Sequence, residues 1–158
     1  MPATTMPVRL LLLLAVLLPA VPLCAQDTTW TPLFDGEKLI GWKHVGDGRF
    51  TIEDGLLKTE GGMGLLWFTG RKVGDEIVRV VYKNPGPSNA GVFIRIPERP
   101  TEPWMPVNRG YEVQIDPRED EDHSTGVLYS LTRAKAKPDL PGDAWNVMEI
   151  TLDGERTL

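Results

Sequence analysis

The sequence is poor in the residues that make disulfides and histidine-based metal sites. One of its 158 residues is a cysteine, Cys24, and two are histidines. A lone cysteine cannot form an intramolecular disulfide, so a hydrophobic core has to hold the fold together. Two histidines are too few for a histidine-rich zinc site. The sequence also lacks a basic cluster and carries a net charge of −5, which argues against a nucleic-acid partner.

Only one long apolar run occurs, Leu10 to Leu18, and it is too short for the roughly 20 residues that span a bilayer. Arg9 precedes the run and small residues follow it, which is typical of a secretory signal peptide. We therefore expect a signal peptide at residues 1–25 and one exported domain at residues 26–158, secreted or periplasmic.

Cys24 leaves open a second way of processing this segment. Lipoprotein signals are cut before a cysteine that is then lipidated, although they favour a small residue where this chain has Leu23. Apart from such an anchor, no membrane partner is expected.

Glycine and proline are abundant, and short apolar runs lie between them, which is typical of an all-β domain. Phe50 to Thr59 predicts a hairpin around the turn Asp54-Gly55. We expect further strands at residues 76–83, 91–96, 111–116, 126–130 and 145–152, and no helix after residue 25. Glu155 to Leu158 begins a return strand that stops at once, so the domain looks truncated at its C-terminal strands.

The segment Gly110 to Asp116 reads GYEVQID, with polar and aliphatic residues alternating. In a strand, Glu112, Gln114 and Asp116 would share one face and the aliphatic residues would cover the core. If the strand around Arg95 lies in the same sheet, its guanidinium would lie near Glu112 or Gln114. Alternation of this kind fits a solvated sheet face as well as a binding site.

An ordered set of short segments is similar to the 3-keto-disaccharide hydrolase family. The resemblance covers about residues 31 to 158, and the chain departs from the family at Ala90 and in its missing C-terminal strands. The matching segments are Leu33-Phe34-Asp35-Gly36, Leu39-Ile40-Gly41-Trp42, Ile52 to Leu57, Ser88 to Arg95, Gly110 to Ile115, Thr125 to Tyr129, and Trp145-Asn146.

The resemblance implies a two-sheet antiparallel sandwich, a concanavalin-like jelly roll, in an exported bacterial protein that acts on glycosides with a ketone at carbon 3. No cofactor is predicted, and a divalent metal stays open. An acidic stretch at residues 118–122 lacks the spacing of a calcium loop and is expected to be a solvated turn. The catalytic candidates are Glu112, Arg95, Gln114 and Tyr129, and the substrate-binding candidates are Asn89, His44, Phe93, Trp104 and Asp116.

These residue types suit elimination better than direct glycoside hydrolysis. A ketone at carbon 3 acidifies the hydrogen on carbon 2, so one base such as Glu112 can start the reaction, with Arg95 stabilising the enolate and Tyr129 or His44 as the acid. Direct hydrolysis needs two carboxyls about 5–5.5 Å or about 6.5–9.5 Å apart. Glu112 and Asp116 would be roughly 13 Å apart along a strand, although a second carboxylate from a neighbouring loop stays open.

A non-catalytic, lectin-like module is the alternative function. Trp42, Trp104 or Trp145 would then stack on sugar rings. In both hypotheses the ligand is a small glycoside or oligosaccharide.

Overall fold

The structure is a computed structural model that describes residues 29–86, 89–117, 120–136 and 143–158. The chain divides into two compact units, residues 1–31 and residues 32–158. The predicted signal peptide lies outside the described residues. All the helices and strands named below belong to the second unit.

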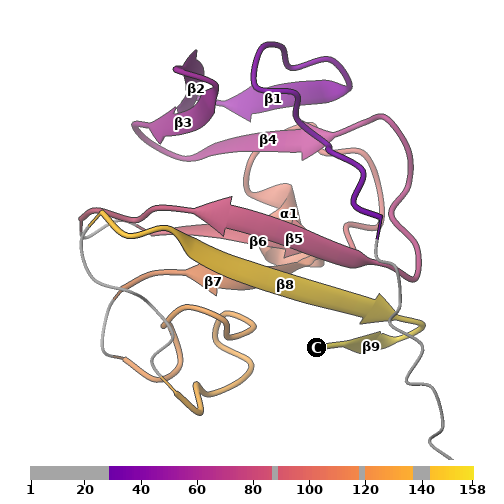
Figure 1. The fold of residues 1–158 in the computed structure, drawn as a ribbon. Coiled ribbons are helices and arrows are strands. Elements are labelled where there is room, and N and C mark those ends of the chain that lie inside the picture. The colour runs from indigo at the N-terminus through magenta and orange to yellow at the C-terminus, as the bar shows by residue number, and fades with distance from the viewer. Residues whose placement is uncertain (1–28, 87–88, 118–119, 137–142) are drawn as a thin grey trace, which may run out of the picture. The chain divides into compact units, whose positions relative to one another are not determined.

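The second unit is built from antiparallel strands with very little helix (Figure 1), as predicted for an all-β domain. The elements are β1 (Trp42–Gly46), β2 (Arg49–Glu53), β3 (Leu56–Glu60), β4 (Gly64–Phe68), β5 (Ile77–Tyr82), β6 (Ala90–Ile94), α1 (Met105–Arg109), β7 (Tyr111–Ile115), β8 (Asn146–Asp153) and β9 (Arg156–Thr157). They pair as β1 with β4, β2 with β3, β6 with β7, and β5 with β8 and β9.

The core lies between the β6–β7 pair and the β5–β8 pair, as in a β-sandwich. Alternate residues of β5 point towards it, so Val78, Val80 and Tyr82 pack against the buried cluster as the strand alternation predicts. Each large aliphatic side chain enclosed in this way contributes about 1.5–3 kcal/mol. The cluster consists of Ile94, Val113, Ile115, Met148, Ile150 and Leu152.

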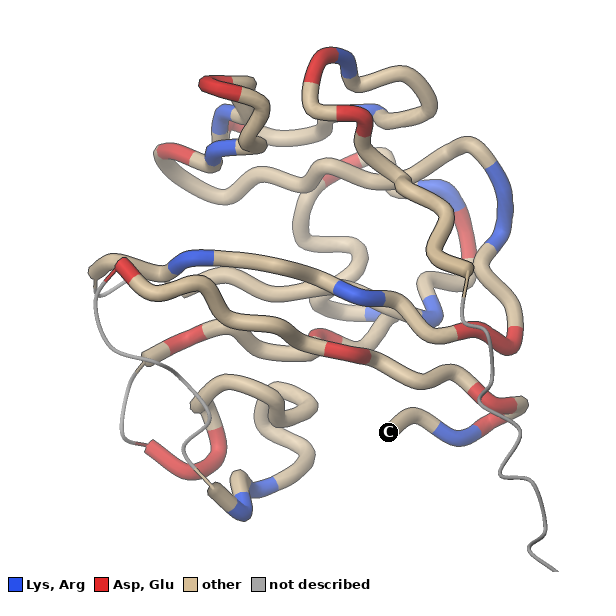
Figure 2. Tube along the Cα trace, in the orientation of Figure 1, with Lys and Arg blue, Asp and Glu red and all other residues tan. Residues whose placement is uncertain are grey.

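The outward face of β5 and β8 is mixed in character. Val81 and Val147 lie opposite each other and are exposed, and the neighbouring Arg79 Nε donates to Glu149 Oε1 at 2.8 Å. Figure 2 shows acidic and basic residues following one another along the trace in the same mixed way. Exposed pairs of this kind contribute about 0.2–1 kcal/mol each.

Three local features differ from the sequence expectations. The helix α1 was not predicted; with Pro106 in its first turn it is too short to show a helical period. The segment 126–130 forms only a single bridge, between Leu128 and Val113, instead of a full strand. Strand β6 ends at Ile94 because Arg95 has a φ of 55°. The predicted Asp54-Gly55 turn is confirmed, with φ values of 52° and 78°.

Candidate active site

Strand β7 has neighbours on both edges. On one edge β6 places Phe93 opposite Glu112. On the other edge Tyr129 N–H donates to the Glu112 carbonyl at 3.0 Å, beside the bridge between Leu128 and Val113. Leu128 packs against the core, so Tyr129, one residue further on, points to the opposite face. Phe93, Glu112 and Tyr129 therefore form one row across three neighbouring segments.

Glu112 is the half-buried carboxylate of this row. Its side chain lies across Gly91, where an added Cβ would be 2.6 Å from Cγ and 2.8 Å from Cδ of Glu112. Its carboxylate makes no hydrogen bond or ion pair with any residue that the structure describes. Burial therefore raises the pKa of Glu112, because desolvation disfavours the charged form and no cation compensates. A carboxylate in this state is a stronger base than one in water.

Aromatic rings stand on both sides of Glu112 in the row. Phe93 and Tyr129 are both half-buried. The Tyr129 hydroxyl makes no hydrogen bond with the described part of the chain. The face thus offers a base, a phenol and two apolar ring surfaces, which are the kinds of group that contact a sugar.

Gln114 and Asp116, the other members of the predicted polar row, are enclosed instead of solvated, with 0% and 1% of their surface exposed. Hydrogen bonds tie this end of the strand to the following turn. The Asp116 N–H donates to Thr125 Oγ1 at 2.9 Å, and the Gly126 N–H donates to the Gln114 carbonyl at 3.0 Å. Neither side chain is open to a sugar in this arrangement.

The Gln114 amide links the enclosed end of the strand to an exposed residue. Its Nε2 donates to Asn89 Oδ1 at 3.3 Å and to Asp116 Oδ2 at 3.4 Å, while its Oε1 is buried without a partner among the described residues. Both partners are acceptors, so the network fixes which end of the amide is nitrogen. Asn89 is exposed, and the bond to its Oδ1 leaves its Nδ2 hydrogens for other acceptors. Gln114 therefore orients Asn89.

Arg95 is not paired with Glu112. Its Nε donates to Thr157 Oγ1 at 3.1 Å and its Nη2 to the Arg156 carbonyl at 2.7 Å, both on β9. The left-handed backbone at Arg95 ends β6 at Ile94. The Arg95 side chain therefore does not share the face of Gly91 and Phe93, as it would in a longer strand. The expected pair fails because the predicted strand was too long.

His44 and Trp104 are predicted site residues that other elements carry. His44 lies on β1, opposite Leu66 of β4, and its ring packs against Phe50 with centroids 5.3 Å apart. Trp104 precedes α1 and is 55% exposed. No hydrogen bond or ring contact among the described residues joins either of them to Glu112.

The structure also gathers residues that the sequence did not single out as a site. His123 contacts Asp120 through one ring nitrogen and Ser130 through the other, and its ring lies against Tyr129, with centroids 4.8 Å apart. His123 is not among the candidate site residues predicted from the sequence. Its contacts depend on how residues 120–130 turn back on themselves, and a single-residue pattern carries no signal for that.

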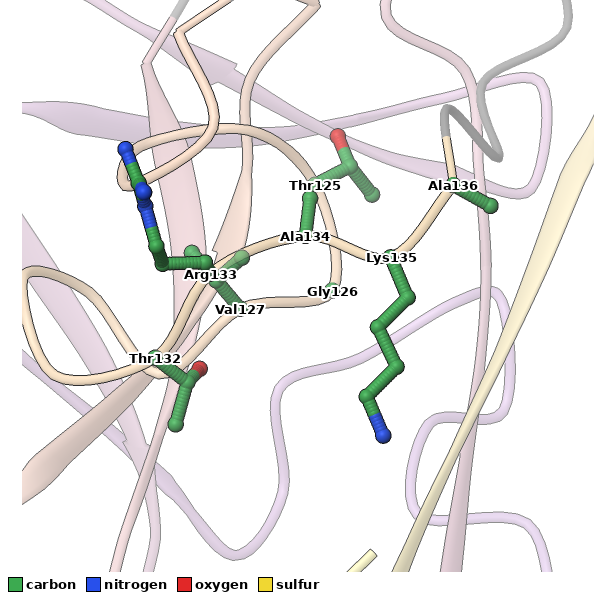
Figure 3. A pocket seen from close by; sticks show the side chains of 8 residues that line it. All are labelled: Thr125, Gly126, Val127, Thr132, Arg133, Ala134, Lys135 and Ala136. Atoms are coloured by element: carbon green, nitrogen blue, oxygen red, sulfur yellow. The ribbon is translucent and has the colours of Figure 1, made fainter.

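A cavity of about 370 Å³ lies beside the enclosed end of β7 (Figure 3). Thr125 and Val127 belong both to its lining and to the segment bonded to β7. Arg133 and Lys135 point away from each other, and Arg133 is paired with Asp122 at 3.1 Å. Glu112 is not part of the lining, which consists of Thr125, Gly126, Val127, Thr132, Arg133, Ala134, Lys135 and Ala136.

The described part of the chain offers neither a metal-binding cluster nor a membrane-spanning helix. No three histidine, cysteine, aspartate or glutamate residues there lie close enough together to hold a metal ion. No helix there is long and apolar enough to cross a membrane.

Comparison with protein families identifies the class of domain. The family model for the 3-keto-alpha-glucoside-1,2-lyase-like domain matches residues 29–157, which is most of the chain. The chain belongs to this family. A search of curated proteins finds no match. Membership in this family supports a carbohydrate-active role for the domain.

Proposed function

We propose that this domain cleaves the glycosidic bond of 3-keto-glycosides by elimination followed by hydration, with Glu112 as the base. The observation that carries the proposal is the half-buried Glu112 carboxylate, which has a raised pKa and no partner among the described residues. A lyase-like family on a 3-keto-glucoside needs one such base.

The first step moves a proton and forms an enolate. Glu112 takes the hydrogen on carbon 2, and the electron pair of that bond moves onto the oxygen of carbon 3. The enolate then re-forms the ketone and expels the oxygen of the aglycone from carbon 1, which leaves a double bond between carbons 1 and 2. Water adds at carbon 1 and a proton returns to carbon 2, so the net reaction is hydrolysis.

Two other groups complete the proposal. Tyr129 lies opposite Glu112 on the same face, and its hydroxyl can give the proton that the leaving aglycone requires. The exposed Asn89, oriented by Gln114, can donate Nδ2–H to the oxygen of carbon 3. Arg95 has no part in this scheme, because its guanidinium is bonded to β9.

The environment of Asp116 favours this route over two-carboxylate hydrolysis. Asp116 is 1% exposed, and its Oδ2 accepts a hydrogen bond from Gln114. It is not available to activate water beside Glu112. A base acting alone on an acidified carbon–hydrogen bond is consistent with this arrangement.

The proposal includes export. The apolar run before residue 25 supports a cleaved signal peptide in a bacterial protein, and the domain would then act in the periplasm or outside the cell. Pulse labelling with and without a signal-peptidase inhibitor tests this. Lipid labelling that depends on Cys24 would identify the anchored form instead.

A second function, carbohydrate binding without catalysis, draws on two exposed tryptophans. Trp104 is 55% and Trp145 44% exposed, and aromatic faces of this kind stack on sugar rings. Lys83 Nζ lies 4.7 Å from the centre of the Trp145 ring, so the lysine already covers part of that ring's face.

The test compares a 3-keto-glucoside with its parent glucoside as substrates. We expect release of the aglycone from the keto compound only, and a loss of at least about 10²-fold in Glu112→Gln. Glu37→Gln is the matched control, because the Glu37 side chain is exposed and only its backbone N–H makes a hydrogen bond, to Asp35 Oδ1. Saturable binding of both sugars without turnover would replace the enzyme by the binding module.

A further inference from the structure

Three side chains outside the Glu112 row form a hydrogen-bonded chain. His123 Nδ1 lies 2.6 Å from Asp120 Oδ2, and His123 Nε2 lies 3.2 Å from Ser130 Oγ. The second carboxylate oxygen of Asp120 accepts the Asp122 N–H at 2.9 Å, which holds Asp120 in place. Both ring nitrogens of His123 are therefore engaged, and its ring orientation is set.

The order Asp–His–Ser matches that of a hydrolytic triad, but the surrounding backbone does not suit one. A triad needs N–H groups near the serine that are free to bind an oxyanion. Here the Ser130 N–H donates to the Asp122 carbonyl at 3.2 Å. The N–H groups of Leu131 and Thr132 both donate to the Leu128 carbonyl, at 2.9 and 3.1 Å. Acyl transfer at Ser130 is therefore not the function of this cluster.

What the cluster does contact is the proposed acid. The His123 ring packs on the Tyr129 ring at 4.8 Å between centroids, with the planes tilted by 53°. Ser130, directly after Tyr129, has a φ of 57° that turns the chain away from β7. The backbone after Tyr129 therefore does not continue as a strand beside β7. The fixed imidazole supplies the support that the strand no longer gives.

We propose that His123, held by Asp120 and Ser130, is a positioning residue that fixes the Tyr129 ring beside Glu112. This inference rests on the proposed function, in which Tyr129 gives a proton to the leaving group. The bond to Asp120 places a hydrogen on Nδ1, so neutral His123 accepts from the Ser130 hydroxyl at Nε2 and protonated His123 donates to it. The ring keeps its orientation in both states.

A double-mutant cycle tests whether His123 acts through Tyr129. We expect His123→Ala to lower kcat on the 3-keto-glucoside by roughly 10- to 100-fold with KM nearly unchanged, since only the placement of the acid is lost. In a Tyr129→Phe background the same change should have no further effect. An equal loss of kcat in both backgrounds would overturn the proposal.

A matched pair of variants at Asp120 separates positioning from general loss of structure. Asp120→Asn keeps an oxygen that can accept from His123 Nδ1 and should retain most of the kcat, whereas Asp120→Ala should resemble His123→Ala. Thermal unfolding monitors the fold in each case. Equal activity of the two Asp120 variants would count against the hydrogen-bonded chain.

A spectroscopic measurement separates failure of this inference from failure of the proposed function. The chain has three tyrosines, so fluorotyrosine labelling gives a 19F spectrum in which the Tyr129 signal is identified by its loss in Tyr129→Phe. His123→Ala should shift the Tyr129 signal and change its width, and should leave the signals of the other two tyrosines unchanged. If the wild type does not cleave the keto compound, the proposed function fails and this spectrum alone decides. An unmoved Tyr129 signal overturns the positioning role.

Discussion

Gly91→Ala tests whether the position of the Glu112 carboxylate controls the reaction. The φ of Gly91 lies outside the left-handed region, so the backbone accepts alanine without strain. The new Cβ would stand 2.6 Å from Glu112 Cγ, whereas carbon atoms pack at about 3.5–4.0 Å. The Glu112 side chain therefore has to move by about 1 Å.

A displacement of this size has a large effect on rate and a small one on stability. A shift of about 1 Å in a reacting group can cost about 10²-fold, so we expect that loss in kcat/KM for the 3-keto-glucoside. Within a strand, alanine is about 0.5–1 kcal/mol more favourable than glycine, which offsets part of the crowding. The free energy of unfolding should change by no more than about 1 kcal/mol.

The assay is steady-state release of the aglycone, with urea unfolding measured on the same samples. Gly62→Ala is the control, because nothing lies within 4 Å of a Cβ at Gly62 and its φ is also outside the left-handed region. Gly62→Ala should keep the wild-type rate. A Gly91→Ala protein that folds and also keeps that rate would refute the assignment of Glu112 as the positioned base.

The remaining predictions concern stability. Burial raises the pKa of the Glu112 carboxyl, so the folded state is favoured while this group is protonated at low pH and loses that advantage as the pH rises through the folded pKa. The stability of Glu112→Gln relative to wild type should therefore rise between about pH 3 and pH 7, and a constant difference between their chemical unfolding curves would contradict this. Ile150→Ala, at a site 2% exposed, should lower the free energy of unfolding by about 2–5 kcal/mol, while Val147→Ala on the outer face should change it by less than about 0.5 kcal/mol; similar losses would argue against the core assignment. Arg95→Ala should cost about 1 kcal/mol in urea unfolding by removing the bonds to Thr157 and Arg156, and no change would mean that those bonds are not kept in solution.

The parts of the fold that follow from local chemistry were predictable from the sequence. Asp54-Gly55 accepts the left-handed backbone that a tight hairpin turn requires, and the turn forms there. In β5 the residues at alternate positions, such as Val78 and Val80, cover the core, because a strand turns successive side chains to opposite faces. The same alternation identified Glu112 and Gln114 as facing away from the core.

The parts that depend on tertiary neighbours were not predictable. Strand β6 ends at Ile94 because Arg95 adopts a positive φ and bonds to β9, and neither a residue type nor a spacing near Arg95 indicates this. The burial of Gln114 similarly depends on the turn that carries Thr125 and Gly126 to that end of β7. A polar row on a strand therefore indicates a face, but the neighbouring segments decide which of its members meet solvent.

Those neighbours give two side chains of β7 different environments and therefore different chemical roles. Beside Glu112 stand Gly91, which leaves room for its side chain, and Tyr129, so the carboxylate is partly desolvated and still unpaired. Two residues further on, Gln114 is enclosed and its Nε2 hydrogens are already used. Desolvation without a partner makes a base stronger, whereas enclosure with partners makes a rigid support. Substitutions at Gln114 should therefore act on the reaction through the orientation of Asn89, and those at Glu112 should act on proton transfer itself.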